Sequence, residues 1–143
     1  MRIAELLKAK AGTAVVTITP EAGVRELLGL LAEHNVGAAL VSTDGETLTG
    51  IVSERDVVRH LHGDGTVVNN TVGAIMTTAV ETCGPDTELD ELMSTMTERR
   101  IRHVPVVSEG RLVGIVSIGD VVKHKMEQLT FERDQLDSYV NQA

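Results

Sequence analysis

The chain has 143 residues, of which 42% are hydrophobic, yet it contains no Trp, one Phe and one Tyr. Its 13 Lys and Arg side chains against 21 Asp and Glu give a net charge of −8, which opposes binding to the phosphate backbone of nucleic acids. Because aromatic platforms for base stacking are also nearly absent, we expect no nucleic-acid partner. The length predicts one domain-sized unit with an aliphatic core.

Two features bear on the compartment. No stretch reaches the roughly 18 apolar residues of a membrane span, and residues 1–7 lack the apolar core and cleavage site of a signal peptide. We therefore expect a soluble, unprocessed chain with no membrane partner. The single cysteine, Cys83, cannot form an internal disulfide, which fits a cytoplasmic location. It lies in an apolar segment, where a buried, inert thiol is favoured over a reactive one.

Most of the chain is a duplication with a period of about 65 residues. Residues 13–60 include Gly-Ile-Val-Ser-Glu-Arg-Asp at 50–56, and residues 78–124 include Gly-Ile-Val-Ser-Ile-Gly-Asp at 114–120. This period is too long for a solenoid repeat and too short for most independent domains. The two halves should therefore share one core.

The first repeat predicts the order strand, helix, strand, strand, helix. Thr19 is placed as an N-cap with Pro20 at the first helical position, and apolar residues at helical spacing begin at Val24. In chain order, the expected elements are a strand over 15–18, a helix to about 34, strands over 38–42 and 48–52 around a turn, and a helix from Ser53 to about Leu61.

The second repeat predicts the same order, with a strand over 80–83, a helix over 85–99, and strands over 103–107 and 111–116. Residues 72–76 resemble a short helical lead-in, and residues 3–7 are its counterpart for the first repeat. The expected divisions are 1–62 for the first repeat with its lead-in, 63–71 for a Gly-, Asp- and Asn-rich linker, 72–126 for the second repeat, and 127–143 for a C-terminal helical extension.

The extension has a seam of positions at alternating spacings of three and four, filled by Met126, Leu129, Leu136 and Val140, with Arg133 at one seam position. Such a helix needs a surface to pack on. It either folds back on its own core or packs against a partner helix, and we expect a homodimer.

Each repeat ends in a Ser-x-x-Asp motif, Ser53 with Asp56 and Ser117 with Asp120. Free N–H groups at a helix N-terminus suit phosphate, and a carboxylate can accept hydrogen bonds from both hydroxyls of a ribose. The same motif is also close to a capping box, in which the two side chains satisfy the amides of their own helix. The repetition does not decide between these interpretations.

The repeats differ where the first helix of each one ends. The second repeat has Arg99, Arg100, Arg102 and His103, where the first has His34, Asn35, Gly37 and Ala38. Arginines can hold phosphates by paired hydrogen bonds, or they can complement the C-terminus of the helix. Any anion sites built on the two repeats should therefore be unequal, the one built on the second repeat binding better.

Catalytic and metal chemistry find little support. The pair His60 and His62 has no further ligands at a recognisable spacing, and no P-loop, dinucleotide fingerprint or nucleophile elbow is present. We expect no metal site, no required cofactor and no catalytic residue.

The duplicated element order, the segment Arg-His-Val-Pro-Val at 102–106 and the two Gly-Ile-Val-Ser-x-x-Asp endings resemble the cystathionine-β-synthase (CBS) domain family, as a stand-alone bacterial pair. The resemblance implies an α+β fold of tandem β-α-β-β-α repeats related by a pseudo-twofold axis. It also implies two clefts that take adenine nucleotides, in which the Asp contacts ribose and the Ser lies near phosphate. The first repeat departs from the pattern with Leu40 where the second has Pro105.

The resemblance and the arginine cluster together imply a set of ligand contacts. In the second repeat they are Thr82, Cys83, Arg100, Arg102, His103, Val104, Ser117 and Asp120. In the first repeat they are Thr17, Ile18, Gly37, Ala38, Ala39, Ser53, Arg55 and Asp56.

The expected function is a regulatory module that senses energy or redox state through an adenine nucleotide and acts on an unknown effector protein. AMP and NAD are the preferred ligands, with ADP, ATP or S-adenosylmethionine as further candidates. The alternative is a structural or interaction protein with unoccupied clefts that acts through its C-terminal helix.

Overall fold

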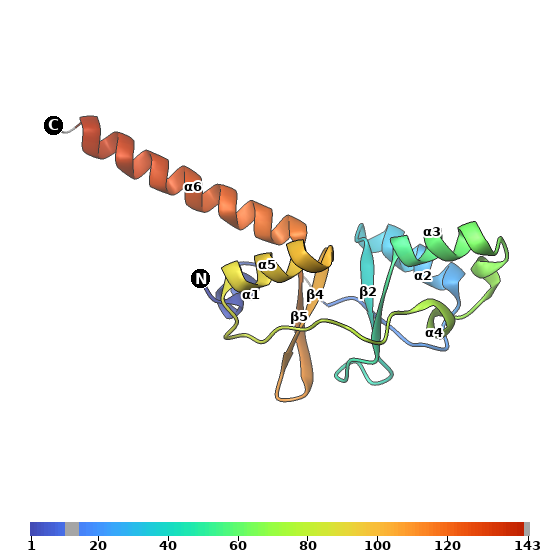
Figure 1. Ribbon diagram of the computed structural model, residues 1–143. Helices are drawn as coiled ribbons and strands as arrows, with labels where there is room; N and C mark the ends of the chain where they lie inside the picture. Colours follow the sequence, from blue (N-terminus) through green and yellow to red (C-terminus); the bar gives the residue numbers. More distant parts are fainter. Residues whose placement is uncertain (11–14, 142–143) are drawn as a thin grey trace.

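The computed structural model describes residues 1–10 and 15–141. Thr13, at which the first copy begins, and the last two residues of the extension lie outside this part. The duplication is visible as two α+β units side by side, with a long helix that leaves the second unit (Figure 1). The predicted fold class, tandem repeats plus an extended C-terminal helix, is confirmed.

The first repeat is built on a three-stranded sheet in the order β1-β2-β3. Strand β1 (Thr17–Ile18) pairs parallel to β2 (Ala38–Val41), which pairs antiparallel to β3 (Gly50–Ser53). In the chain, helix α2 (Val24–His34) lies between β1 and β2, and helix α3 (Glu54–Gly63) follows β3. The apolar stripe predicted for α2 is buried at Val24, Leu27 and Leu31, so this face packs into the core of the repeat.

The second repeat repeats this plan with β4 (His103–Ser108) antiparallel to β5 (Arg111–Ser117), and with α5 (Leu89–Arg99) before them. The expected strand over 80–83 is reduced to one parallel bridge between Cys83 and Val106, the counterpart of the pair Ile18 and Val41. A twofold-like relation therefore holds even where the strand is too short to be assigned.

Both first helices begin later than predicted. Thr19 is not an N-cap: its carbonyl accepts the Ala22 N–H in a turn, and α2 begins at Val24. The Pro20 carbonyl accepts the Gly73 N–H at 2.8 Å, so a contact from the lead-in of the second repeat holds this segment outside the helix. In the second repeat, the Pro85 carbonyl likewise accepts the Ala4 N–H, and α5 begins at Leu89.

These contacts reveal an exchange of lead-in helices. Helix α1 (Ile3–Ala9) packs into the core of the second repeat, where Ile3 and Leu6 are buried. Helix α4 (Val72–Ile75) packs into the core of the first, together with the 3-10 turn η1 (Val67–Asn69) of the predicted linker. Each core is completed by a segment that precedes the other repeat in sequence.

The last helix, α6 (Ile118–Asn141), begins in the second core, where Val121 is buried, and Lys125 pairs with Asp90 of α5 at 2.8 Å. Beyond this point it extends away from the body of the protein (Figure 1), and Met126, Leu129 and Leu136 are exposed. Of the helices described, none combines the length and apolar character needed to cross a membrane.

Candidate functional site

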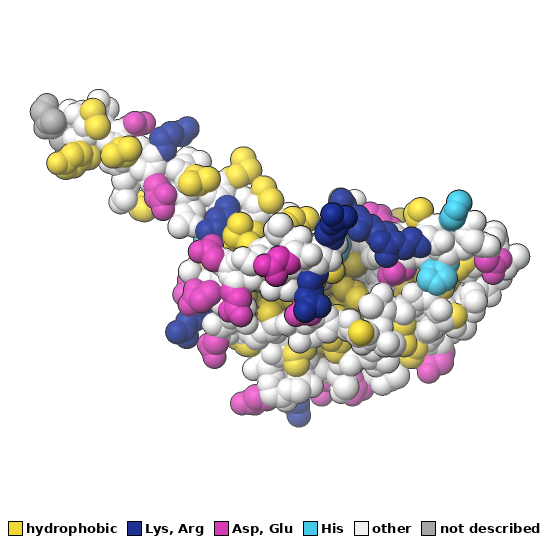
Figure 2. All heavy atoms as spheres, viewed as in Figure 1, with side chains coloured by type: hydrophobic (Ala, Val, Ile, Leu, Met, Phe, Trp, Pro, Cys, Tyr) yellow, Lys and Arg dark blue, Asp and Glu magenta, His cyan; other side chains and the backbone are white. Residues whose placement is uncertain are grey.

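An open cleft of about 710 Å³ lies between the two repeats. One wall is the end of β3 and the start of α3 in the first repeat, and the other is the segment from the end of α5 to the start of β4 in the second. The residues after α4, including Thr77 and Val80, close a third side. Seen as solid atoms, the molecule is hollowed between its two halves, with dark-blue basic side chains along one rim (Figure 2).

The wall from the first repeat is organised by a capping box. Ser53 is the N-cap of α3, and its hydroxyl accepts the Asp56 N–H at 3.3 Å. In return, Oδ2 of Asp56 accepts the Ser53 N–H at 2.9 Å. The capping interpretation of this motif is therefore confirmed. The cap engages Oδ2, and Oδ1 of Asp56 has no hydrogen bond to another described residue, so the carboxylate can still accept from a ligand.

Five arginines line the cleft against three carboxylates, a local excess of positive charge in a protein of net charge −8. They come from α3 and from the end of α5, and are Arg55, Arg59, Arg99, Arg100 and Arg102. Arg99 pairs with Glu81 at 3.5 Å, whereas the other four form no ion pair with a described residue. The cleft is therefore suited to an anionic ligand.

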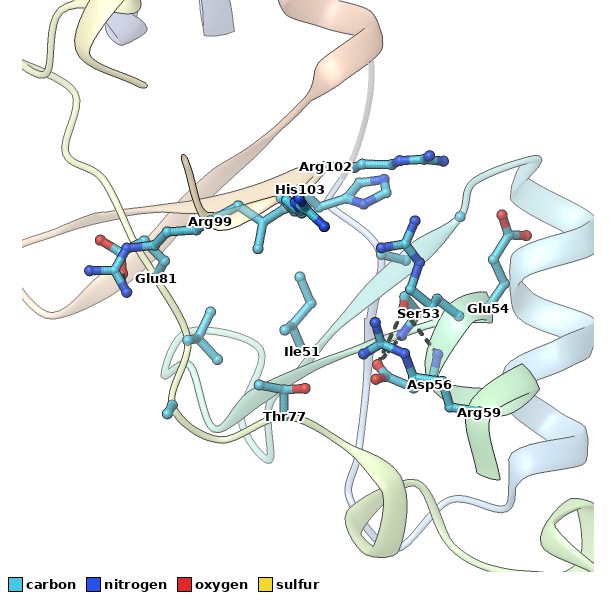
Figure 3. A pocket seen from close by; sticks show the side chains of 17 residues that line it. Ile51, Ser53, Glu54, Asp56, Arg59, Thr77, Glu81, Arg99, Arg102 and His103 are labelled. Carbon is cyan, nitrogen blue, oxygen red and sulfur yellow. Dashed lines mark hydrogen bonds and ion pairs between the residues drawn. The ribbon is translucent and has the colours of Figure 1, made fainter. Parts of the chain in front are cut away.

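Asp56 and Arg59 lie on one side of this space, and Arg99, Arg102 and His103 lie on the other (Figure 3). Ile51 and Thr77 border the space between them, with Ile101 also in its lining. The site thus combines a charged rim with an apolar floor, and its two charged sides belong to different repeats.

His103 lies where the two repeats meet. A Cβ placed on Gly37 would lie 3.4 Å from Oε1 of Glu54 and 3.6 Å from Cε1 of His103, so both side chains lie beside this glycine of the first repeat. Burial is the main reason that the pKa of His103 is lowered, although the carboxylates of Asp120 and Glu54 act in the opposite direction. The imidazole is therefore held toward its neutral form near pH 7.

The second motif has the same cap but a different neighbour. Oδ2 of Asp120 accepts the Ser117 N–H at 2.8 Å, and the Ser117 hydroxyl accepts the Asp120 N–H at 3.2 Å. The Lys10 ammonium group also donates to Oδ2 of Asp120 at 2.8 Å. Burial raises the pKa of Asp120, but the hydrogen bonds from Lys10 and Ser117 outweigh it and the net pKa is lowered.

The structure thus regroups the predicted residues. Arg100, Arg102 and His103 were grouped with Ser117 and Asp120, whereas the open cleft brings them to the first repeat's motif. The predicted residues that line this cleft are Gly37, Ala38, Ser53, Arg55, Asp56, Arg100, Arg102 and His103. The expectation that the cleft at Asp120 binds better stays a prediction, since no ligand contact tests it.

Other predicted contacts are set back from this cleft. Ile18, Ala39 and Val104 are buried in the two cores, which leaves only their backbone groups for a ligand. Thr17 lies in β1, and Thr82 is its counterpart in the second repeat, where it is exposed. Cys83 packs against the second core, and burial raises the pKa of its thiol to about 11, as expected for an unreactive group. The ligand roles of these residues stay predictions.

Several lining residues were not predicted, notably Arg59, Glu81 and Ile101. Arg59 is one helical turn after Arg55, and this i, i+4 spacing could have indicated that both face the same side. Glu81 and Ile101 carry no such signal, because their position depends on how the repeats pack together. Within residues 1–10 and 15–141, no three His, Cys, Asp or Glu side chains lie together in a way that could hold a metal ion.

Comparison with known proteins agrees with this architecture. A curated relative, the mitochondrial CBS domain-containing protein CBSX3 of Arabidopsis thaliana, is 35% identical over 96% of this chain and 71% of its own length. A CBS-domain containing protein of Agrobacterium tumefaciens has a crystal structure that matches with a TM-score of 0.82 and 42% identity, covering 87% of this chain and 99% of its own.

A CBS domain protein of Pyrobaculum aerophilum, solved in complex with AMP, matches with a TM-score of 0.74 and 28% identity, covering 84% of this chain and 89% of its own. The family model of the CBS domain matches the sequence twice, over residues 10–63 and 72–127, in step with the two repeats. The duplicated sequence, the paired fold and this double match together show that the chain belongs to the CBS domain family.

Proposed function

We propose that this protein is a regulatory module that binds an adenine nucleotide, of the AMP or NAD type, in the cleft between its repeats. The observation that carries the proposal is the cleft at Asp56, which is lined by five arginines from both repeats around an apolar floor. AMP in the solved relative from Pyrobaculum aerophilum supports the same ligand class.

The chemistry of the cleft fits the three parts of such a ligand. The unengaged oxygen of Asp56 is placed to accept hydrogen bonds from ribose hydroxyls. Arginines of both repeats can bind phosphate oxygens in pairs, and Arg55 lies at the N-terminus of α3, where the helix dipole also favours negative charge. The apolar residues Ile51 and Ile101 offer a surface for the base.

Regulation follows from the position of the ligand between two units. A nucleotide that contacts both repeats favours one arrangement over another only by its difference in affinity for the two. Under this proposal the module catalyses no reaction itself and regulates a separate effector protein. It is a homodimer and works in the cytoplasm. A second candidate function, an interaction protein without ligand, is favoured by the exposed apolar residues of α6.

Calorimetric titration with AMP, NAD, ATP, S-adenosylmethionine and adenosine tests the proposal. We expect AMP or NAD to bind, and adenosine to bind at least about tenfold more weakly because charge-assisted hydrogen bonds to phosphate are lost. The cationic S-adenosylmethionine should be disfavoured by the arginines. If none of these ligands binds at millimolar concentration, the proposal is wrong and the interaction protein gains support.

A further inference from the structure

The ion pair between Lys10 and Asp120 joins residues 110 positions apart in the sequence. Both side chains are only about a fifth exposed, at 22% and 21%, and the Lys10 ammonium group also donates to the Ile115 carbonyl at 2.9 Å. The lysine therefore has two acceptors and little contact with water, unlike a solvated surface pair.

The first repeat shows what this lysine replaces. There, the Ile51 carbonyl, which corresponds to that of Ile115, accepts the Thr77 backbone N–H at 2.8 Å. Thr77 lines the open cleft, and Asp56 has no cation within ion-pairing distance among the described residues. At the second motif, the Lys10 side chain donates to the corresponding carbonyl and also to Oδ2 of Asp120, the oxygen that accepts the Ser117 N–H. Its charge therefore neutralises that of the Asp120 carboxylate, whereas Asp56 retains its negative charge in full.

The sequence explains why the lysine reaches this place in only one half. Leu7 lies over Gly114 as Met76 lies over Gly50, so the two lead-ins are equivalent up to these residues. Nine residues lie between Leu7 and Thr17, whereas five lie between Met76 and Thr82, the counterpart of Thr17. The connection that follows Leu7 is therefore four residues longer than the one that follows Met76. Helix α1 uses this length to extend to Ala9, with Lys10 as its C-cap.

We propose that Lys10 is a built-in cation that neutralises Asp120 at the second ligand position, and that a nucleotide binds tightly there only after Lys10 is released. The proposal rests on the proposed function, and it adds a regulatory contact that the first position lacks. Since Ile3 and Leu6 of α1 are buried in the second core, the N-terminal helix is the element that senses this release. The position at Asp56 would then fill at a lower nucleotide concentration than the one at Asp120, the reverse of the order expected from the sequence.

Calorimetric titration with AMP should separate the two positions. The wild-type chain is expected to bind one AMP tightly, and Lys10→Met to bind a second at least about tenfold more tightly than wild type does, because the Asp120 carboxylate is no longer neutralised by the lysine. Lys8→Met is the matched control, an exposed lysine of the same helix. A second site that is unchanged or weakened in Lys10→Met would overturn the proposal, weakening being the mark of a lysine that contacts the ligand directly.

A measurement without nucleotide keeps this inference separate from the proposed function. In an NMR titration, the pKa of the Asp120 carboxyl should rise when Lys10 is replaced by Met and stay unchanged in Lys8→Met. If AMP binds to none of the proteins, the proposed function fails. The NMR titration still tests the ion pair between Lys10 and Asp120 in that case. An Asp120 pKa that does not rise in Lys10→Met shows that the lysine does not occupy the carboxylate, and the inference is then wrong.

Discussion

Asp56 is the residue on which ligand binding should depend most directly. Replacing it with Asn keeps an acceptor for the Ser53 N–H, so the cap of α3 is largely retained. The loss of the charge should weaken AMP binding by roughly ten- to a hundredfold, since hydrogen bonds to a charged group contribute about 1.5–3 kcal/mol. Calorimetry measures the change.

The matched control for this variant is Asp64→Asn, which alters a carboxylate at the other end of the same helix, outside the cleft. It should bind AMP as the wild type does. Equal affinity in Asp56→Asn and wild type would show that the ribose contact lies elsewhere.

His103 should make the stability of the protein depend on pH. The pKa of His103 is lower in the folded chain than the ordinary histidine value of 6.5, mainly because of burial. As the pH falls below 6.5, this histidine therefore binds a proton more readily in the unfolded chain than in the folded one. The free energy of unfolding should therefore fall as the pH is lowered through this value. The neighbouring charges are Asp120 and Glu54, which favour the charged imidazole, and Arg102 and Lys10, which oppose it.

Urea denaturation between pH 7.5 and pH 5.5 tests this effect above the range in which Asp120 titrates. His103→Gln should lose less stability than wild type over this interval. The control is His62→Gln, which makes the same change at an exposed histidine outside the cleft. Equal slopes in all three proteins would contradict the assignment to His103.

At the scale of elements, α6 carries the strongest prediction about assembly. Met126, Leu129, Leu136 and Val140 lie along one stripe at spacings of three and four, with Arg133 between the two leucines, and the four apolar residues are 62 to 64% exposed. If a second α6 covers this stripe, Leu129→Glu combined with Leu136→Glu should convert a dimer into a monomer, because each charge would be buried without a partner.

Light scattering after size-exclusion chromatography measures the mass of each protein. The control is Gln128→Glu with Gln135→Glu, which adds the same charge one residue before each leucine, off the apolar stripe. Neither pair touches a core, so the thermal unfolding of the repeat should hardly change. A dimer that persists in the leucine variant would show that α6 is not the interface.

The elements that the sequence predicts well are those governed by local contacts. The capping boxes at Ser53 and Ser117 and the stripe of α2 depend on residues within a few positions of each other. The starts of α2 and α5 were mispredicted because the Pro20 and Pro85 carbonyls accept N–H groups from α4 and α1, which are distant in sequence. A local cap signal could not reveal that competition.

The same distinction applies to the candidate site. Asp56 and the arginines could be predicted as single residues from motif and charge. Their grouping across the repeats could not, because it depends on how the two units pack face to face. The contact of Lys10 with Asp120 could not be predicted either. Comparing the two repeats gives no sign of it, because no lysine lies between Met76 and Thr82 in the corresponding segment of the second repeat.

For the whole molecule, the exchange of lead-in helices changes where the chain can be divided. All the buried residues of the first core, from Ile18 to Ile75, fall within residues 16–77. A cut at the predicted linker, giving residues 1–71, removes Val72 and Ile75 from that core. We expect the fragment 16–77 to unfold cooperatively when heated, although its size is close to the lower limit for a single core. Fragment 1–71 should show no such transition in circular dichroism.

A full-length variant tests the exchange without relying on a fragment. Ile75 is 4% exposed within the first core, and replacing it with Ala should cost about 2–5 kcal/mol, as for other large-to-small changes in a core. Ala74→Gly, at an exposed position of the same short helix, should cost about 1 kcal/mol or less. If α4 did not complete the first core, Ile75→Ala would be no more harmful than the control, and the chain would divide at its linker as the duplication alone suggests.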